Sequence, residues 1–186
     1  MAASDEELML AYAGGDAAAF EALYARHKGP LYRFVLRSVK VAAEADEIFQ
    51  DVWMRAIEAR GRYQPTAKFR TWLYTIAHNR LVDHWRARGL TMVPIDTGDG
   101  DDGPSVDPPA GPSAEPHRRA EGRQQVARLL EALAALPAAQ REAFLMHEES
   151  GLSVAEIARA MGVGEETAKS RLRYAMNKLR EAIDDD

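Results

Sequence analysis

Two stretches of this sequence carry side chains suited to binding nucleic acid, and the first lies near the C-terminus. Residues 165–180 hold five basic and two acidic residues. The basic ones are Lys169, Arg171, Arg173, Lys178 and Arg180. Ser153 and Glu156 form a capping-box pattern and Gly162 permits a helix end, so a short helix precedes the basic one. This order is typical of a helix-turn-helix, whose second helix enters the major groove. The alternative is a helical hairpin with a solvated basic face.

The second stretch, residues 63–88, mixes aromatic, basic and amide side chains. The aromatic residues are Tyr63, Phe69, Trp72, Tyr74 and Trp85, and the basic ones are Lys68, Arg70, Arg80, Arg86 and Arg88. Single-stranded nucleic acid is bound by basic side chains, which contact the phosphates, and by aromatic rings, on which unstacked bases stack. Asn79 can read a base edge. Trp72 follows the helical period of apolar residues, so we expect it in the core, whereas a nucleic-acid surface explains the basic set better than solubility does.

No pattern for catalysis or metal binding stands out. His78 and His84 are six residues apart, which does not place them on one helix face, so we expect ordinary surface or phosphate-side residues. The chain has no cysteine, which excludes disulfides and cysteine metal sites. Asp99, Asp101 and Asp102 lack the ligand spacing of an EF-hand. We therefore expect no metal, no cofactor and no enzymatic activity.

The net charge of −5 over 186 residues does not suggest DNA binding, but the charge is segregated. Residues 60–89 carry seven basic residues and one acidic residue, whereas residues 44–58 carry five acidic residues and one basic residue. Residues 91–116 hold six acidic residues and no lysine or arginine. The sequence has an acidic N-terminus and no apolar run long enough for a membrane span. We expect a cytoplasmic protein that is monomeric when free and does not insert into a membrane.

The elements that position these residues are all helices, which predicts an all-α fold of two small helical domains. Residues 4–90 form the first domain: one helix is capped by Ser4 or Asp5, the next by Asp16, and two more span about 44–60 and 67–88. Residues 91–117 read as a flexible acidic linker rich in proline and glycine. Residues 118–182 form the second domain, with four helices. We expect its core at Leu129, Leu130, Leu133, Leu136, Phe144 and Leu145, and a buried stripe on the last helix at Ala168, Leu172, Ala175, Met176 and Leu179.

With these motifs in order, the chain resembles the extracytoplasmic-function (ECF) sigma factors of RNA polymerase along nearly all of its length. Residues 43–58 look like the helix that binds core polymerase. Residues 69–86 look like the helix that recognises and melts the −10 element. Residues 136–173 look like the helix-turn-helix that reads the −35 element. The family also implies an anti-sigma partner and a linker that threads the polymerase cleft.

The resemblance implies three sets of contact residues. Those facing core polymerase are Asp46, Glu47, Phe49, Gln50, Asp51 and Trp53. Those contacting the single-stranded −10 element are Tyr63, Lys68, Phe69, Arg70, Asn79, Arg80, His84, Arg86 and Arg88, and the loop 62–68 holds a flipped base. Those contacting the duplex −35 element are Ser153, Thr167, Lys169, Ser170, Arg171 and Arg173. Glu165 and Glu166 depart from the family, which more often has a small residue and a glycine there.

Two other classes of protein fit parts of the sequence. A dimeric transcription regulator would join a helix-turn-helix to an effector domain, which should contain a phosphoacceptor or ligand pocket. A helical adaptor without DNA activity would not need the helix that combines aromatic and basic residues. An enzyme fits least well.

Overall fold

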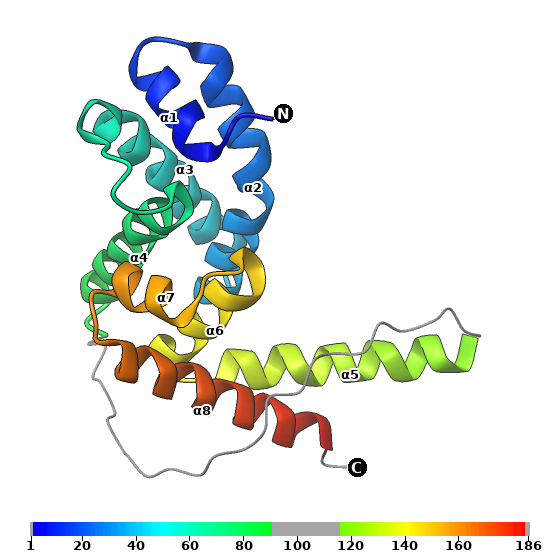
Figure 1. The fold of residues 1–186 in the computed structure, drawn as a ribbon. Helices are drawn as coiled ribbons and strands as arrows, with labels where there is room; N and C mark the ends of the chain where they lie inside the picture. Colours follow the sequence, from blue (N-terminus) through cyan, green and yellow to red (C-terminus); the bar gives the residue numbers. More distant parts are fainter. Residues whose placement is uncertain (1, 91–115, 185–186) are drawn as a thin grey trace.

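The computed structural model describes residues 2–90 and 116–184, and the regular structure in these ranges is helical. In the N-terminal half, α1 spans Asp5–Ala13, α2 Ala17–Val39, α3 Ala42–Ala59 and α4 Phe69–Ala87, with a 3-10 turn, η1, at Arg60–Arg62. Helix α2 packs against α1 on one side and α3 on another, and α3 in turn packs against α4 (Figure 1). This half therefore forms a four-helix unit, and the expected helix count is confirmed.

Capping chemistry sets the starts of the first two helices, as the sequence predicts. Ser4 and Glu7 close a capping box at the start of α1. Asp16 accepts hydrogen bonds from the first N–H groups of α2. Helix α2 continues through Pro30 and ends at Lys40, whose φ of 68° is left-handed. A lysine in that conformation is unusual, because its Cβ crowds the backbone.

The C-terminal half also has the expected four helices: α5 spans Pro116–Ala135, α6 Ala138–Ser150, α7 Val154–Met161 and α8 Glu165–Asp184. Ser153 and Glu156 form the predicted capping box, and Gly162 ends α7 with a left-handed φ of 67°. Helix α8 packs against α5, α6 and α7, and the N-terminal part of α5 extends beyond the other helices (Figure 1). Among the described residues, no helix is both long and apolar enough to cross a bilayer.

Two residues expected in the core are exposed instead. Leu130 is 44% exposed and Met176 is 37% exposed. Each directly follows a residue that does pack inward, Leu129 on α5 and Ala175 on α8. Successive residues on a helix are rotated by about 100°, so the inward-facing stripe is narrower than the apolar run. Trp72, expected in the core, packs against it.

The two halves pack against each other, which the sequence does not predict. Helix α6 lies against α2, and α7 lies against α4 (Figure 1). Buried apolar residues on both sides, such as Phe34 on α2 and Met146 on α6, belong to one continuous cluster. The helix-turn-helix is thus held against the helix that combines aromatic and basic residues.

Candidate nucleic-acid and polymerase interfaces

The outer face of α3 presents the polar residues expected to meet the polymerase. Asp46, Glu47 and Gln50 are exposed, while Ile48 and Val52 point into the core. The spacing of polar and apolar residues on this helix therefore places the polar set outward. The Tyr32 hydroxyl donates to Asp46 Oδ1 over 2.8 Å, and this bond raises the pKa of Tyr32 and orients the carboxylate.

Two members of the same predicted set pack inward. Trp53 is only 5% exposed and its ring lies 5.1 Å from that of Tyr24 and 5.8 Å from that of Phe20. Phe49 is half-buried and meets the Trp53 ring at 6.4 Å. In this structure these two rings pack on the core side of α3, while the polar residues form its outer face.

The acidic residues of α3 pair with the basic residues of α4. Arg80 is bonded to Asp51 and lies 3.7 Å from Glu47. Near the other end of the contact, Glu44 is bonded to Arg88 and lies 3.4 Å from His84. The acidic and basic segments, separate in the sequence, thus partly neutralise each other in space.

His84 and Arg80 are consequently less available to phosphate than the sequence suggests. Burial lowers the pKa of His84, and the nearby Arg88 and Arg80 lower it further against the opposing effect of Glu44. A lowered pKa leaves the imidazole neutral at pH 7, so His84 does not supply a positive charge there. Only 13% of the Arg80 side chain is exposed. The exposed polar residues of α4 are Asn79, Asp83 and Arg86, and Arg88 at its C-cap is exposed as well.

The loop before α4 is anchored by aromatic rings. Tyr63 is 6% exposed and Phe69 is 1% exposed. The Tyr63 ring lies 5.1 Å from Trp72 and 6.2 Å from Phe69. Burial, with the negative charges of acidic residues on α1, raises the pKa of Tyr63 to about 12. These buried rings hold the loop in place and do not present a free face on which a base could stack.

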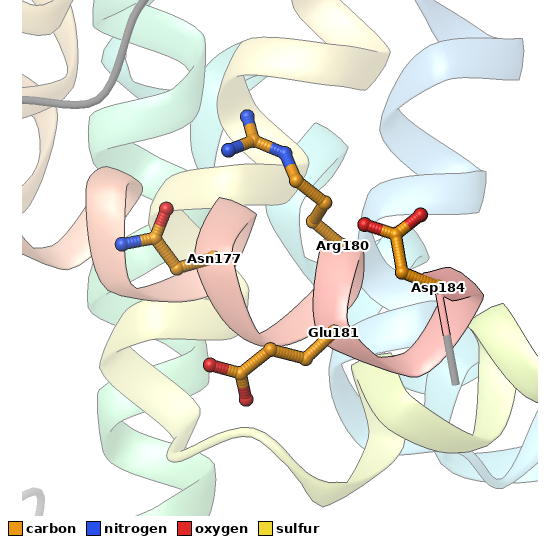
Figure 2. A pocket seen from close by; sticks show the side chains of 4 residues that line it. All are labelled: Asn177, Arg180, Glu181 and Asp184. Carbon is orange, nitrogen blue, oxygen red and sulfur yellow. The ribbon is translucent and has the colours of Figure 1, made fainter.

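The helix-turn-helix leaves the start of α8 accessible. Lys169 is exposed, and Thr167, Ser170, Arg171 and Arg173 are partly exposed. The hydroxyl of Ser153 accepts the Glu156 N–H over 3.2 Å, so this side chain serves the cap of α7. The far end of α8 has a different character: Asn177, Arg180, Glu181 and Asp184 line a shallow hollow there (Figure 2). The lining residues include two acids and one base, a composition that does not favour phosphate binding at that end.

Ionic contacts between the two halves involve residues predicted to bind DNA. Lys68 Nζ lies 3.0 Å from Glu156 Oε1 of the α7 cap. Arg70 donates to the carbonyl of Ser150 over 2.8 Å. Partial burial opposes ionisation of Glu156, but its bonds with Ser153 and Lys68 outweigh this and lower its pKa. Two expected −10 contacts are therefore engaged by the C-terminal half.

Glu149 at the end of α6 makes further ionic contacts between the two halves. It is bonded to Arg37 and accepts a hydrogen bond from Arg33 Nε over 2.7 Å, both from α2. Arg141, buried on α6, donates to the carbonyl of Ser38 on α2 over 3.1 Å. These partners lie more than 100 positions apart in the sequence, so no local pattern indicates the contacts.

His78 corrects one expectation. It is not a surface residue but is 9% exposed, and its Nδ1 lies 2.6 Å from Glu142 Oε1, which is itself buried. The pair links α4 to α6, and α6 covers this part of α4 because the halves pack together. Among residues 2–90 and 116–184, no group of three or more histidines and acidic residues is placed to hold a metal ion.

Comparison with known families gives two matches along the chain. Residues 23–91 match the family described as Sigma-70 region 2, and residues 127–179 match the family described as Sigma-70, region 4. The first match covers most of α2 and all of α3 and α4, and the second covers the last part of α5, all of α6 and α7 and most of α8.

Individual proteins agree with these matches. The sigma factor CarQ of Myxococcus xanthus is 32% identical over 174 residues, which cover 89% of each chain. The ECF sigma factor SigL of Mycobacterium tuberculosis is 33% identical over 171 residues, which cover 90% of each chain. The sigma factor RpoE of Bartonella quintana, solved with the anti-sigma factor NepR, superposes with a TM-score of 0.65 at 25% identity, over 90% of this chain and 98% of that one.

Proposed function

This chain belongs to the ECF sigma factors of RNA polymerase, a non-enzymatic family that directs transcription initiation, and we propose that it divides this task between its two halves. Residues 4–90 bind core polymerase and the −10 element, residues 118–182 bind the −35 element, and residues 91–117 connect them. The observation that supports this division is that each half exposes amide or basic side chains on a helix of its own, α4 or α8.

Core polymerase contacts the outer face of α3 in this proposal. Asp46 and Gln50 make the direct contacts, because both are exposed and neither is buried in the α3–α4 ion pairs. Asp51 and Glu47 contribute less, since both also face Arg80. Phe49 and Trp53 keep the helix in position.

The −10 strand follows α4. Asn79 is exposed and can read a base edge, and Arg86 and Arg88 meet phosphates. Lys68 and Arg70 also meet phosphates once their contacts with the C-terminal half are broken. On α8, Lys169, Arg171 and Arg173 contact the −35 duplex, since residues near the start of a recognition helix face base edges.

The closed packing must therefore open before both promoter elements are bound. Glu156 and Ser150 compete with phosphate for Lys68 and Arg70 while α6 and α7 lie against the N-terminal half. DNA supplies free energy for separation, because it binds Lys68 and Arg70, which contact the C-terminal half in the closed form. The isolated protein is expected to bind promoter DNA weakly.

An anti-sigma protein is a further partner in this proposal, because the structurally similar RpoE of Bartonella quintana was solved with one. A partner of this kind shifts the equilibrium toward the closed form if it binds that form more tightly. Core polymerase, promoter DNA and such a partner place the working protein in the cytoplasm.

Reconstitution with core polymerase, followed by selection of promoters from random DNA, tests the whole proposal. The expected result is two sequence elements at a fixed separation, with no selection when polymerase is omitted. A single element, or equal selection by the free protein, would refute the division of labour.

The core-binding assignment has its own matched pair of variants. Asp46→Ala and Gln50→Ala should each weaken polymerase binding by about fivefold, as when an interface contact worth about 1 kcal/mol is lost. Glu58→Ala removes an exposed side chain from the same helix and should leave affinity unchanged. Equal affinity in all three variants would contradict the assignment.

A further inference from the structure

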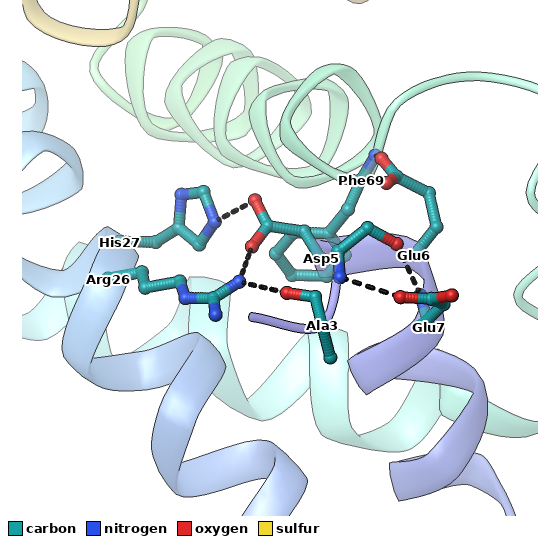
Figure 3. Close-up of polar contacts among 8 residues, drawn as sticks. Ala3, Asp5, Glu6, Glu7, Arg26, His27 and Phe69 are labelled. Atoms are coloured by element: carbon teal, nitrogen blue, oxygen red, sulfur yellow. Dashed lines mark hydrogen bonds and ion pairs between the residues drawn. The ribbon is translucent and has the colours of Figure 1, made fainter. Parts of the chain in front are cut away.

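The start of α4 is capped by a residue from another helix. Lys68 occupies the N-cap position, and its side chain makes no capping bond. Instead, the N–H of Phe69 donates to Glu6 Oε1 on α1 over 2.7 Å, although the two residues are 63 positions apart. Figure 3 shows the Glu6 carboxylate beside Phe69. A carboxylate here satisfies a free N–H and interacts favourably with the positive end of the helix dipole.

Helix α1 is itself fixed, so Glu6 has a defined position. Asp5 accepts from Arg26 over 2.8 Å and lies 2.7 Å from His27 Nε2, which ties α1 to α2 (Figure 3). Burial opposes ionisation of Asp5, but Arg26 and His27 outweigh it and hold the pKa of Asp5 below its usual value. Glu7 completes the capping box of α1. Three successive acidic residues therefore contact three different helices: Asp5 contacts α2, Glu6 contacts α4 and Glu7 caps α1.

Helix α1 also lies beside the loop that precedes α4. Helix α1 contacts both η1 and α4, the two elements that bound the loop. The His27 ring lies 5.2 Å from that of Phe69, and Phe69 packs on Tyr63 and Trp72. The negative charge of Glu6 reaches Tyr63 as well, since it contributes to that residue's raised pKa. Loop 62–68 thus has aromatic anchors on its inner side and one charged anchor at its end.

We propose that Glu6 is a positioning residue for promoter melting: it holds the first turn of α4, and with it loop 62–68, in the conformation that accepts an unpaired base. This inference rests on the proposed function, in which that loop holds the base. Glu6 acts through Phe69 and touches no DNA. Without its carboxylate, the first turn of α4 loses its only cap from a described side chain, and the loop is held by ring packing alone.

The carboxylate also keeps phosphate away from this helix end. A helix N-terminus with free N–H groups binds anions readily, and Lys68 beside it adds positive charge. Glu6 occupies the Phe69 N–H, so a DNA phosphate that approaches Lys68 does not bind the helix end instead. The backbone then follows α4 in one register, and this places the base at the loop.

The test measures base preference in the holoenzyme. Promoters that carry each of the four bases at each position of the −10 element are compared by permanganate reactivity of unpaired thymines. Glu6→Ala should reduce the preference at the loop position by about fivefold, the factor that corresponds to a lost helix cap. Glu6→Gln should retain most of the preference, because its amide oxygen can accept the Phe69 N–H. Binding to core polymerase should not change in either variant.

Asp16→Ala is the matched control, because Asp16 is also a carboxylate cap, and its capping bonds are to Ala18 and Ala19 at the start of α2. It should lower the melting temperature while the base preference stays intact. If Glu6→Ala does not fold, Glu6→Asp replaces it, since the shorter side chain keeps the charge but cannot reach Phe69.

Two results would overturn the inference but not the proposed function. One is a wild-type base preference in the variant that lacks the Glu6 contact, and the other is an equal loss of base preference in Asp16→Ala. A wild-type holoenzyme without base preference at any −10 position would instead refute the role of the loop, and the inference with it.

Discussion

Replacing Glu149 with alanine should loosen the packing of α6 against α2. Glu149 is enclosed, with 7% of its side chain exposed, and both Arg33 and Arg37 reach it from α2. Alanine has the highest helix propensity, so the substitution removes the carboxylate without disturbing α6. The two arginines are left facing solvent, and the halves lose contacts that exist only when they are together.

The size of the effect follows from the exposure of the partners. A hydrogen bond to an enclosed charged group contributes about 1.5–3 kcal/mol, whereas an exposed ion pair contributes about 0.2–1 kcal/mol. The arginine side chains are 49% and 41% exposed, so solvent screens these pairs strongly. We expect about 1–2 kcal/mol in total, which shifts the equilibrium between closed and separated forms by about 5- to 30-fold.

Energy transfer between two dyes measures this shift directly. The chain has no cysteine, so cysteines introduced at the exposed positions Glu21 on α2 and Asn177 on α8 can be labelled cleanly. Transfer should fall in Glu149→Ala and stay unchanged in Glu148→Ala, which removes an exposed neighbour of the same charge. Identical transfer in both variants would show that the Glu149 contacts do not hold the halves together.

Three further predictions concern charge and DNA contacts. The pKa of Glu156 lies below its usual 4.5, so its stabilising effect is present above that pH and is lost as pH falls through the lowered value. Glu156→Gln should flatten this part of the melting-temperature profile, and an unchanged profile would rule out the Lys68 contact as its source. Arg171→Ala and Lys169→Ala should each cost about 1–3 kcal/mol of −35 duplex binding, so intact binding would exclude α8 as the reader. Asn79→Ala should reduce open-complex formation more than initial duplex binding, whereas equal losses would indicate a plain duplex contact.

The α8 variants have a control on the same helix. Arg180→Ala removes an identical side chain at the end where Glu181 and Asp184 lie, and it should leave −35 binding intact. A loss as large as that in Arg171→Ala would mean that net charge, rather than position on the helix, decides affinity.

Local chemistry explains which parts of the fold could be predicted from the sequence. Ser4, Asp16 and Ser153 mark helix starts, because their side chains bond backbone groups only two or three residues away. Gly162 marks a helix end for a similar reason, since the left-handed conformation depends on one residue. Such interactions involve neighbours in the chain, so the sequence alone contains them.

The rest depended on contacts between distant residues. His78 reads as a surface histidine until α6 brings Glu142 to it, 64 positions later. The cap of α4 is equally distant, since Glu6 belongs to the first helix. Charge segregation along the sequence suggested separate surfaces, yet Arg80 and Asp51 share one ion pair. The sequence shows how many charged residues each segment carries but not which of them form ion pairs.

The ion pairs between α3 and α4 also affect how mutations in this protein should be interpreted genetically. A change at Arg80 releases Asp51 on the polymerase-facing helix, so one lesion alters the surfaces proposed for two different macromolecules. Loss of transcription after such a change does not reveal which surface failed. A reciprocal exchange, Arg80→Asp combined with Asp51→Arg, can restore the pair where neither single change is tolerated. Natural variation at these two positions should accordingly be correlated, because a substitution on one helix limits which residues are tolerated on the other.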